Sequence, residues 1–227
     1  MDNQKIGRIL RASTTGFVTG CRVAELTAPA FGSLVKAQPV DAREAIYGLI
    51  YDMHIDDDPL VRRLVLAESP AEAVINDQRE NRLLPVEMSV LAVGYGANGR
   101  GDRNGRIRHA LPPRPPLNLD PVLLCLEHQE VLDFTDHFGY FRLILRTAQS
   151  GVPVEQLLVA HILDVHATRQ DDAWVMAAIT ELIELLRSNY EMLIPTLEAL
   201  SDAFPNLPLD LPEAETRTET RSGELPF

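Results

Sequence analysis

Cysteine is almost absent from the sequence, which has 227 residues and only two cysteines, Cys21 and Cys125. They lie far apart, and neither belongs to a C-x-x-C pair. Two cysteines are too few for a disulfide scaffold, and isolated thiols are mostly buried in protein cores. We therefore expect both side chains to be buried thiols.

Long apolar runs and an excess of positive charge are also lacking. The polar start Met1-Asp2-Asn3-Gln4-Lys5 leads into no long apolar run, so we expect no signal peptide, no membrane span and a cytoplasmic location. The formal net charge of -12 argues against a surface that coats DNA, although it leaves room for a local basic site. With 45% hydrophobic residues, the chain can still bury a core.

The sequence has no motif that would bind a nucleotide or perform catalysis. The pattern G-x-x-x-x-G-K-[ST] does not occur, and the G-x-G-x-x-G match from Gly94 to Gly99 leads into Arg100-Gly101-Asp102, which cannot begin a stable helix. No G-x-S-x-G, Ser-His-Asp or Cys-His arrangement can be argued. We therefore expect a protein that is not an enzyme, holds no cofactor and neither binds nor hydrolyses ATP.

Histidines and acidic residues gather in the second half, at His161, Asp164, His166, Glu181 and Glu184. Residues five apart on one helix point about 140° away from each other, so His161 and His166 do not converge as metal ligands. His161 also lies on an apolar stripe, which is typical of a histidine inside the core. The sequence therefore predicts no metal site.

Strand patterns fill the first part of the chain. Residues 45–55 alternate with period two, and shorter candidates lie at 6–12, 17–23, 31–37 and 86–95. This spacing predicts a barrel or a sandwich. Of the two, the predicted fold is a small antiparallel β-barrel of five or six strands, the form that the family resemblance given below implies.

One helix is predicted between two of these strands. Ser69-Pro70-Ala71-Glu72 has the form of a capping box with proline at the first helical position, and the helix should end before Pro85. Residues 59–68 fit either a helix or a strand.

The second part of the chain changes to a helical period. Apolar stripes over residues 119–204 predict a bundle of four or five helices. Residues 96–118 are predicted to be a linker rich in glycine, arginine and proline, and 205–227 a disordered acidic tail. The predicted fold class is α+β: a barrel domain at 4–95, the linker, and a C-terminal helical bundle.

The predicted linker carries five arginines and a single acid, Asp102, within residues 94–116. A mobile basic segment can neutralise phosphates without reading bases, but interleaved aromatic residues that would stack on bases are missing. The alternative is a solubilising linker that contacts acidic surface. The candidate contact residues for nucleic acid or a partner are Arg100, Arg103, Arg106, Arg108 and Arg114.

Trp174 is the only tryptophan in the sequence. It lies one residue from the centre of an apolar stripe, so we expect it to be partly buried against the helix at 153–168. If it is exposed instead, it becomes a candidate interface anchor, because exposed tryptophans are enriched at binding hot spots.

The strand-rich part also resembles a known family, in runs that follow one another in a characteristic order. These are Ile6-Gly7-Arg8-Ile9, Thr15-Gly16-Phe17, Phe31-Gly32-Ser33-Leu34-Val35-Lys36 and Ile46-Tyr47-Gly48-Leu49-Ile50. Together they resemble the HAS barrel, which HerA-type DNA translocases carry ahead of their motor domain. The run Leu111-Pro112-Pro113-Arg114-Pro115-Pro116 before a helical segment is similar to stand-alone barrel proteins of unknown function from cyanobacteria.

In HerA-type proteins, the barrel helps subunits assemble and forms the docking surface for the NurA nuclease. The resemblance therefore implies a non-catalytic assembly or docking module, accessory to a HerA-type ATPase or a nuclease in DNA processing. This chain has a helical segment in place of the motor. One alternative is a partner of another ring ATPase without nucleic-acid contact, and another is a metal-dependent enzyme with an unrecognised site. We also expect a homo-oligomer, as a dimer rather than a ring.

Overall fold

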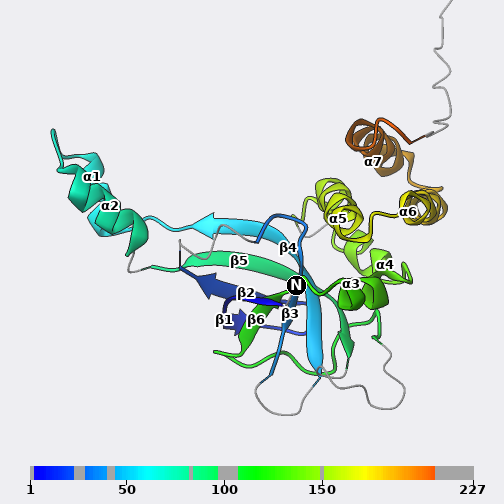
Figure 1. Ribbon diagram of the computed structural model, residues 1–227, viewed down its shortest axis with the longest axis horizontal. Coiled ribbons are helices and arrows are strands. Elements are labelled where there is room, and N and C mark those ends of the chain that lie inside the picture. The colour runs from blue at the N-terminus through cyan, green and yellow to red at the C-terminus, as the bar shows by residue number, and fades with distance from the viewer. Residues whose placement is uncertain are drawn as a thin grey trace, which may run out of the picture.

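The protein is a closed antiparallel β-barrel followed by helices (Figure 1), which confirms the predicted α+β fold. The computed structural model describes residues 3–22, 29–39, 44–81, 84–96, 107–148 and 151–207. The strands pair in the order β1-β2-β5-β4-β3-β6, and β6 returns to β1. Their bounds are β1 Gln4–Ala12, β2 Gly16–Cys21, β3 Leu34–Ala37, β4 Ala45–Ile55, β5 Val86–Gly96 and β6 Pro121–Leu124.

The sixth strand comes from beyond residue 95, where the sequence prediction ended the barrel. β6 pairs with β1 on one side, where Gln4 faces Leu124, and with β3 on the other, where Val35 faces Leu124. Without these four residues β1 and β3 would both be open edges. The barrel is therefore completed from the segment that the sequence assigned to the helical domain.

The barrel wall has two apolar faces along β4 and β5. Ile46, Ile50 and Val90 belong to the core cluster that fills the barrel, whereas Leu49 and Leu91 belong to a second cluster shared with the helices. A strand that is buried on both sides has no polar face. This explains the continuous apolar run at residues 90–93. The same wall joins the barrel to the helices, because its outer face belongs to the second cluster.

Two short helices form an arm at the far end of the long β4–β5 ribbon. They are α1 Pro59–Val65 and α2 Glu72–Glu80, and they project away from the barrel (Figure 1). α1 settles the open question at residues 59–68, because the Asp58 carboxylate accepts a hydrogen bond from the Leu60 N–H at 2.8 Å and caps a helix. The predicted capping box is not formed, since α2 starts at Glu72 with Ala71 as its N-cap.

The remaining helices pack against one side of the barrel. They are α3 His128–Thr135, α4 Phe141–Leu145, α5 Val154–Arg169, α6 Asp172–Leu186 and α7 Tyr190–Ala203. α5 is central, in contact with α3, α4, α6 and α7. Among the described residues, no helix is both long enough and apolar enough to cross a membrane.

The second half of the predicted linker is packed onto the barrel. Arg108 and Tyr95 exchange backbone hydrogen bonds of 2.8 and 3.0 Å, and Pro112 and Pro116 are buried. Residues 97–106 lie outside the described ranges, as do 208–227 of the predicted tail. From Ile107 onward, the segment thus fastens the barrel rather than separating it from the helices.

Candidate docking surface

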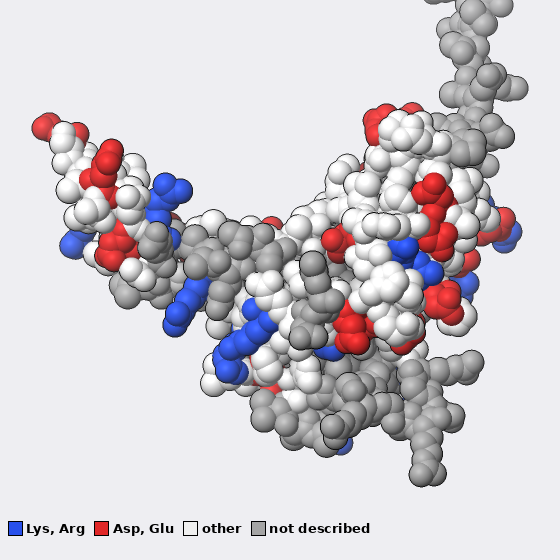
Figure 2. Space-filling view, in the orientation of Figure 1, with Lys and Arg blue, Asp and Glu red and all other residues white. Residues whose placement is uncertain are grey.

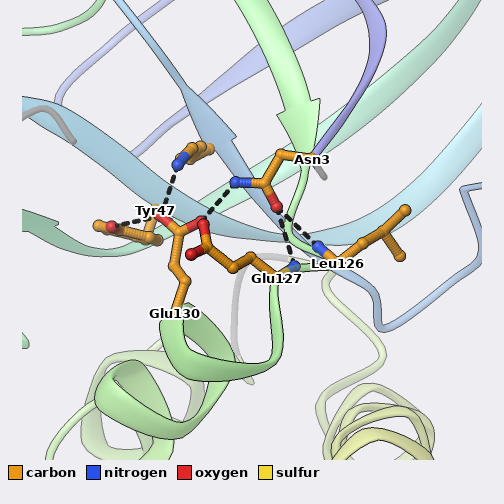
Figure 3. A network of polar contacts seen from close by, with 6 residues as sticks. Asn3, Tyr47, Leu126, Glu127 and Glu130 are labelled. Carbon is orange, nitrogen blue, oxygen red and sulfur yellow. Dashed lines mark hydrogen bonds and ion pairs between the residues drawn. The ribbon is translucent and has the colours of Figure 1, made fainter. Parts of the chain in front are cut away.

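A buried polar network fixes α3 to the barrel (Figure 3). Glu130 of α3 accepts hydrogen bonds from Lys36 Nζ at 2.6 Å and from the Tyr47 hydroxyl at 2.8 Å, both at Oε1. Its other oxygen accepts from Asn3 Nδ2 at 2.5 Å. The Asn3 carbonyl oxygen in turn accepts from the backbone N–H groups of Leu126 and Glu127, at 2.8 and 3.1 Å. Each member of this network has a partner, as buried polar groups require.

The electrostatics of this network favour a structural role. Burial, reinforced by the negative charge of Glu130, raises the pKa of Tyr47. The Cys125 thiol lies in the adjacent core, and burial raises its pKa well above the usual range. Both groups are therefore neutral at physiological pH, and neither is an activated nucleophile. Both cysteines are buried thiols, as the sequence predicted.

His161 forms a second tie between barrel and helices. Its Nδ1 lies 3.1 Å from the Gly32 carbonyl, which can only accept, so Nδ1–H donates there and Nε2 accepts from the Tyr140 hydroxyl at 3.0 Å. Burial lowers the pKa of His161 to about 4, which keeps the ring neutral. A side chain at Gly32 would meet Ala160 Cβ at 2.7 Å, so glycine is needed for this close approach. The predicted core histidine is confirmed.

Trp174 is buried in the core that the helices share, with 5% of its surface exposed. Its indole N–H donates to the Thr135 carbonyl at 2.8 Å, and the ring lies beside Phe138 and under the Arg169 guanidinium. The side chain is therefore not accessible to a partner, and it contributes to the core.

The predicted arginine contacts do not form one site in the described residues. Arg108 is held at the barrel by its backbone pairing, with its guanidinium 6.0 Å from the centre of the Tyr95 ring. Arg114 is exposed within the proline run. Arg100, Arg103 and Arg106 lie outside the described ranges.

The arm is the most exposed apolar feature of the described chain. Val65 and Leu66 at the end of α1 are 77% and 78% exposed. No residue of α1 is buried, and the described side chains of α2 are exposed or half-buried. Figure 2 shows the arm standing clear of the body, with a hollow between it and the helical end of the molecule. An adjoining groove of about 230 Å³ between the two helices is lined mainly by Val61, Leu64, Pro70 and Ile75.

The sequence prediction missed the arm as a functional element. A signal was present, because Val65 and Leu66 form an apolar pair within a short segment between two long strands. Their exposure depends on how far the β4–β5 ribbon carries them from the body, which no local pattern reports. Within the described ranges, no group of three or more His, Cys, Asp or Glu residues is placed to hold a metal ion.

A scan of the chain against protein-family models finds no match, and no curated protein matches it either.

Proposed function

We propose that this protein is a non-catalytic docking module, in which the barrel and helices hold the α1–α2 arm out for a protein partner. The observation that carries the proposal is the exposure of Val65 and Leu66 on an arm without buried apolar residues in α1. Full burial of one such side chain in an interface contributes about 1.5–3 kcal/mol. Two adjacent residues of this kind suit the centre of a binding hot spot.

The length of the arm helices supports the same proposal. α1 has 7 residues and α2 has 9. Helices shorter than about 12–15 residues are marginal in water unless they pack against something. α1 and α2 contact only each other among the described elements with several contacts, and a partner that covers the arm would add apolar contacts to these.

The proposed partner is a HerA-type ATPase or a NurA-type nuclease in DNA processing. This part rests on the resemblance of the strand-rich half to the HAS barrel. A different ring ATPase, without nucleic-acid contact, is the second candidate, and the mixed charge of the arm suits either. The third hypothesis, a metal-dependent enzyme, has no supporting ligand group in the described ranges. Nucleic-acid contact would rest on exposed Arg114 and on the arginines between 100 and 106.

Self-association is a further part of the proposal. Exposed apolar residues lie on α5, α6 and α7, and a second copy would cover them: Leu163, Ile183, Tyr190 and Ile194. A two-fold dimer through these helices would leave the arm free for a different partner. Light scattering on the full chain at micromolar concentration tests this, and a monomer of 25.2 kDa would contradict it.

Titration calorimetry with the purified ATPase and nuclease of the same organism tests the docking proposal. Leu66→Asp should weaken binding by about tenfold or more, because it puts a charge into the interface. Leu117→Asp is the matched control, since Leu117 is an exposed leucine at a turn that is not part of the arm. Equal affinities for wild type and Leu66→Asp would contradict docking through the arm. If neither protein binds the wild type, the named partners are wrong.

A further inference from the structure

A cavity of about 620 Å³ lies where the β1–β2 turn meets α4 and the start of the next connection. Its size falls within the range of small-molecule sites, which often form where two parts of a fold meet. The arm lies at the far end of the β4–β5 ribbon and contributes none of the lining. The inference drawn from it is therefore independent of the docking proposal.

The walls of this cavity are mainly apolar. Leu91 of β5 and Val152 form one part, and Leu111 and Leu143 are further apolar lining residues. Leu111 and Leu143 are not buried by the fold itself, so a bound molecule would cover them. Apolar side chains of this kind select a ligand with an apolar body.

The charged residues of the lining are both cationic. They are Arg11 and Arg146, and none of the lining residues that the structure describes is Asp or Glu, although the chain has 33 acidic residues and a net charge of -12. Arg11 is oriented by Glu87, with Nη2 2.7 Å from Oε2. Arg146, at the end of α4, is exposed, and none of the described residues forms an ion pair with it. A positive group beside an apolar wall selects an anion.

The hydroxyl groups at the rim are already ordered. Ser13 Oγ lies 2.9 Å from Thr15 Oγ1 and donates to the Gly16 carbonyl at 3.2 Å, and Thr147 Oγ1 donates to the Ile144 carbonyl at 2.6 Å. These bonds order the β1–β2 turn and the end of α4, each within its own segment, and both segments line the cavity. Ordered lining groups lower the entropic cost of binding.

We infer that this cavity binds a small amphipathic anion, with its anionic group at Arg146 and its apolar body against Leu91, Leu111 and Leu143. The ligand class is an organic carboxylate, sulfonate or phosphate with a hydrocarbon or aromatic body. An inorganic anion would use only the guanidinium, and a neutral apolar molecule only the walls.

Fluorescence titration of the full-length protein with 8-anilinonaphthalene-1-sulfonate tests the inference, because this dye is an aromatic anion. Saturable binding is expected, and Arg146→Glu should weaken it by about tenfold, as loss of a charge-assisted contact does. Arg142→Glu is the matched control: Arg142 lies on the same helix, is exposed and does not line the cavity. It should change the affinity by less than about twofold, as surface charges usually do.

Three further arms separate the alternatives. Arg146→Gln removes the charge without reversing it, and it too should weaken the binding of the anionic dye. This variant takes the place of Arg146→Glu if the latter does not fold. The neutral dye N-phenyl-1-naphthylamine should bind wild type and Arg146→Glu alike. Decanoate should displace the anionic dye at constant ionic strength, and inorganic phosphate should not.

The inference is overturned if Arg146→Glu and Arg142→Glu affect the anionic dye equally, which would indicate long-range electrostatics only. It is also overturned if Leu66→Asp abolishes dye binding, because the dye would then sit on the arm. Displacement by phosphate as effective as that by decanoate would overturn the amphipathic part.

Discussion

His161 couples the stability of the protein to pH. Its pKa is lowered by burial to about 4 in the folded state, whereas an unfolded histidine titrates near 6.5. Below about pH 6.5 the unfolded chain takes up a proton that the folded ring refuses, so the free energy of unfolding falls as the pH falls toward 4. Between pH 7 and 5, this one group should remove about 2 kcal/mol of stability.

Urea unfolding of wild type and His161→Gln at pH 7 and pH 5 measures this contribution. The variant should be less stable at pH 7, because it disturbs the bonds to Tyr140 and Gly32, but its stability should fall less on acidification. His137→Gln, at an exposed histidine, is the control and should behave as wild type. The same fall in stability for wild type and His161→Gln would show that His161 titrates normally.

Trp174 tests the packing of the helices. Trp174→Ala should lower the free energy of unfolding by about 3 kcal/mol, because it leaves a cavity beside Phe138 and Thr135. Trp174→Phe keeps most of the ring and loses the N–H donor to the Thr135 carbonyl, so about 1 kcal/mol is expected. Denaturant titration measures both. A loss below about 0.5 kcal/mol for the alanine variant would place the side chain on the surface.

The surroundings of some residues could be predicted from the sequence, and those of others could not. The buried position of His161 was predictable from the apolar stripe on its helix. The Glu130 network did not, because it joins Asn3, Lys36 and Tyr47 to a helix about a hundred residues away. Such contacts depend on how the barrel closes, and no local spacing encodes that.

Strands and helices were predictable where their patterns were long. The strand at 45–55 was predicted with the bounds that the structure has, because eleven residues show a clear period. β6 was missed, since its four residues Pro121–Leu124 are too short to show one. The predicted capping box was wrong, because Ser69 and Pro70 belong to the connection between α1 and α2 rather than to the start of a helix.

The contacts of the arm indicate that its removal should not destabilise the barrel. Ile55 and Val86 face each other at the end of the β4–β5 ribbon, so Asn-Gly in place of residues 56–85 would close a two-residue hairpin there. Since α1 buries no residue, the free energy of unfolding should change by less than about 1 kcal/mol.

Thermal and denaturant unfolding of this armless variant check the expectation. Leu66→Asp is the smaller companion change, and it too should unfold like the wild type. A large loss of stability in the armless variant would mean that the arm supports the fold, and would remove the reason to regard it as a docking element.

Barrel and helices form one cooperative unit in this account. Leu34, Leu49 and Leu91 of the barrel wall share a core with the helices, and β6 lies beyond the predicted linker. A fragment of residues 1–98 should therefore fail to give a stable monomeric barrel, because without β6 it leaves β1 and β3 as open edges and an apolar wall exposed. Circular dichroism and light scattering on the fragment test this. A soluble monomer with a cooperative unfolding transition would contradict it.

Photo-crosslinking in the native cell tests docking through the arm most directly. A photoreactive amino acid at position 66 of the full-length protein should give a discrete adduct with a different protein, whereas an adduct with a second copy of this chain would contradict the account. Adding Val65→Asp should abolish the adduct, and the same photoreactive residue at position 117 should not give it. The absence of an adduct from position 66, or the same products from both positions, would contradict the account.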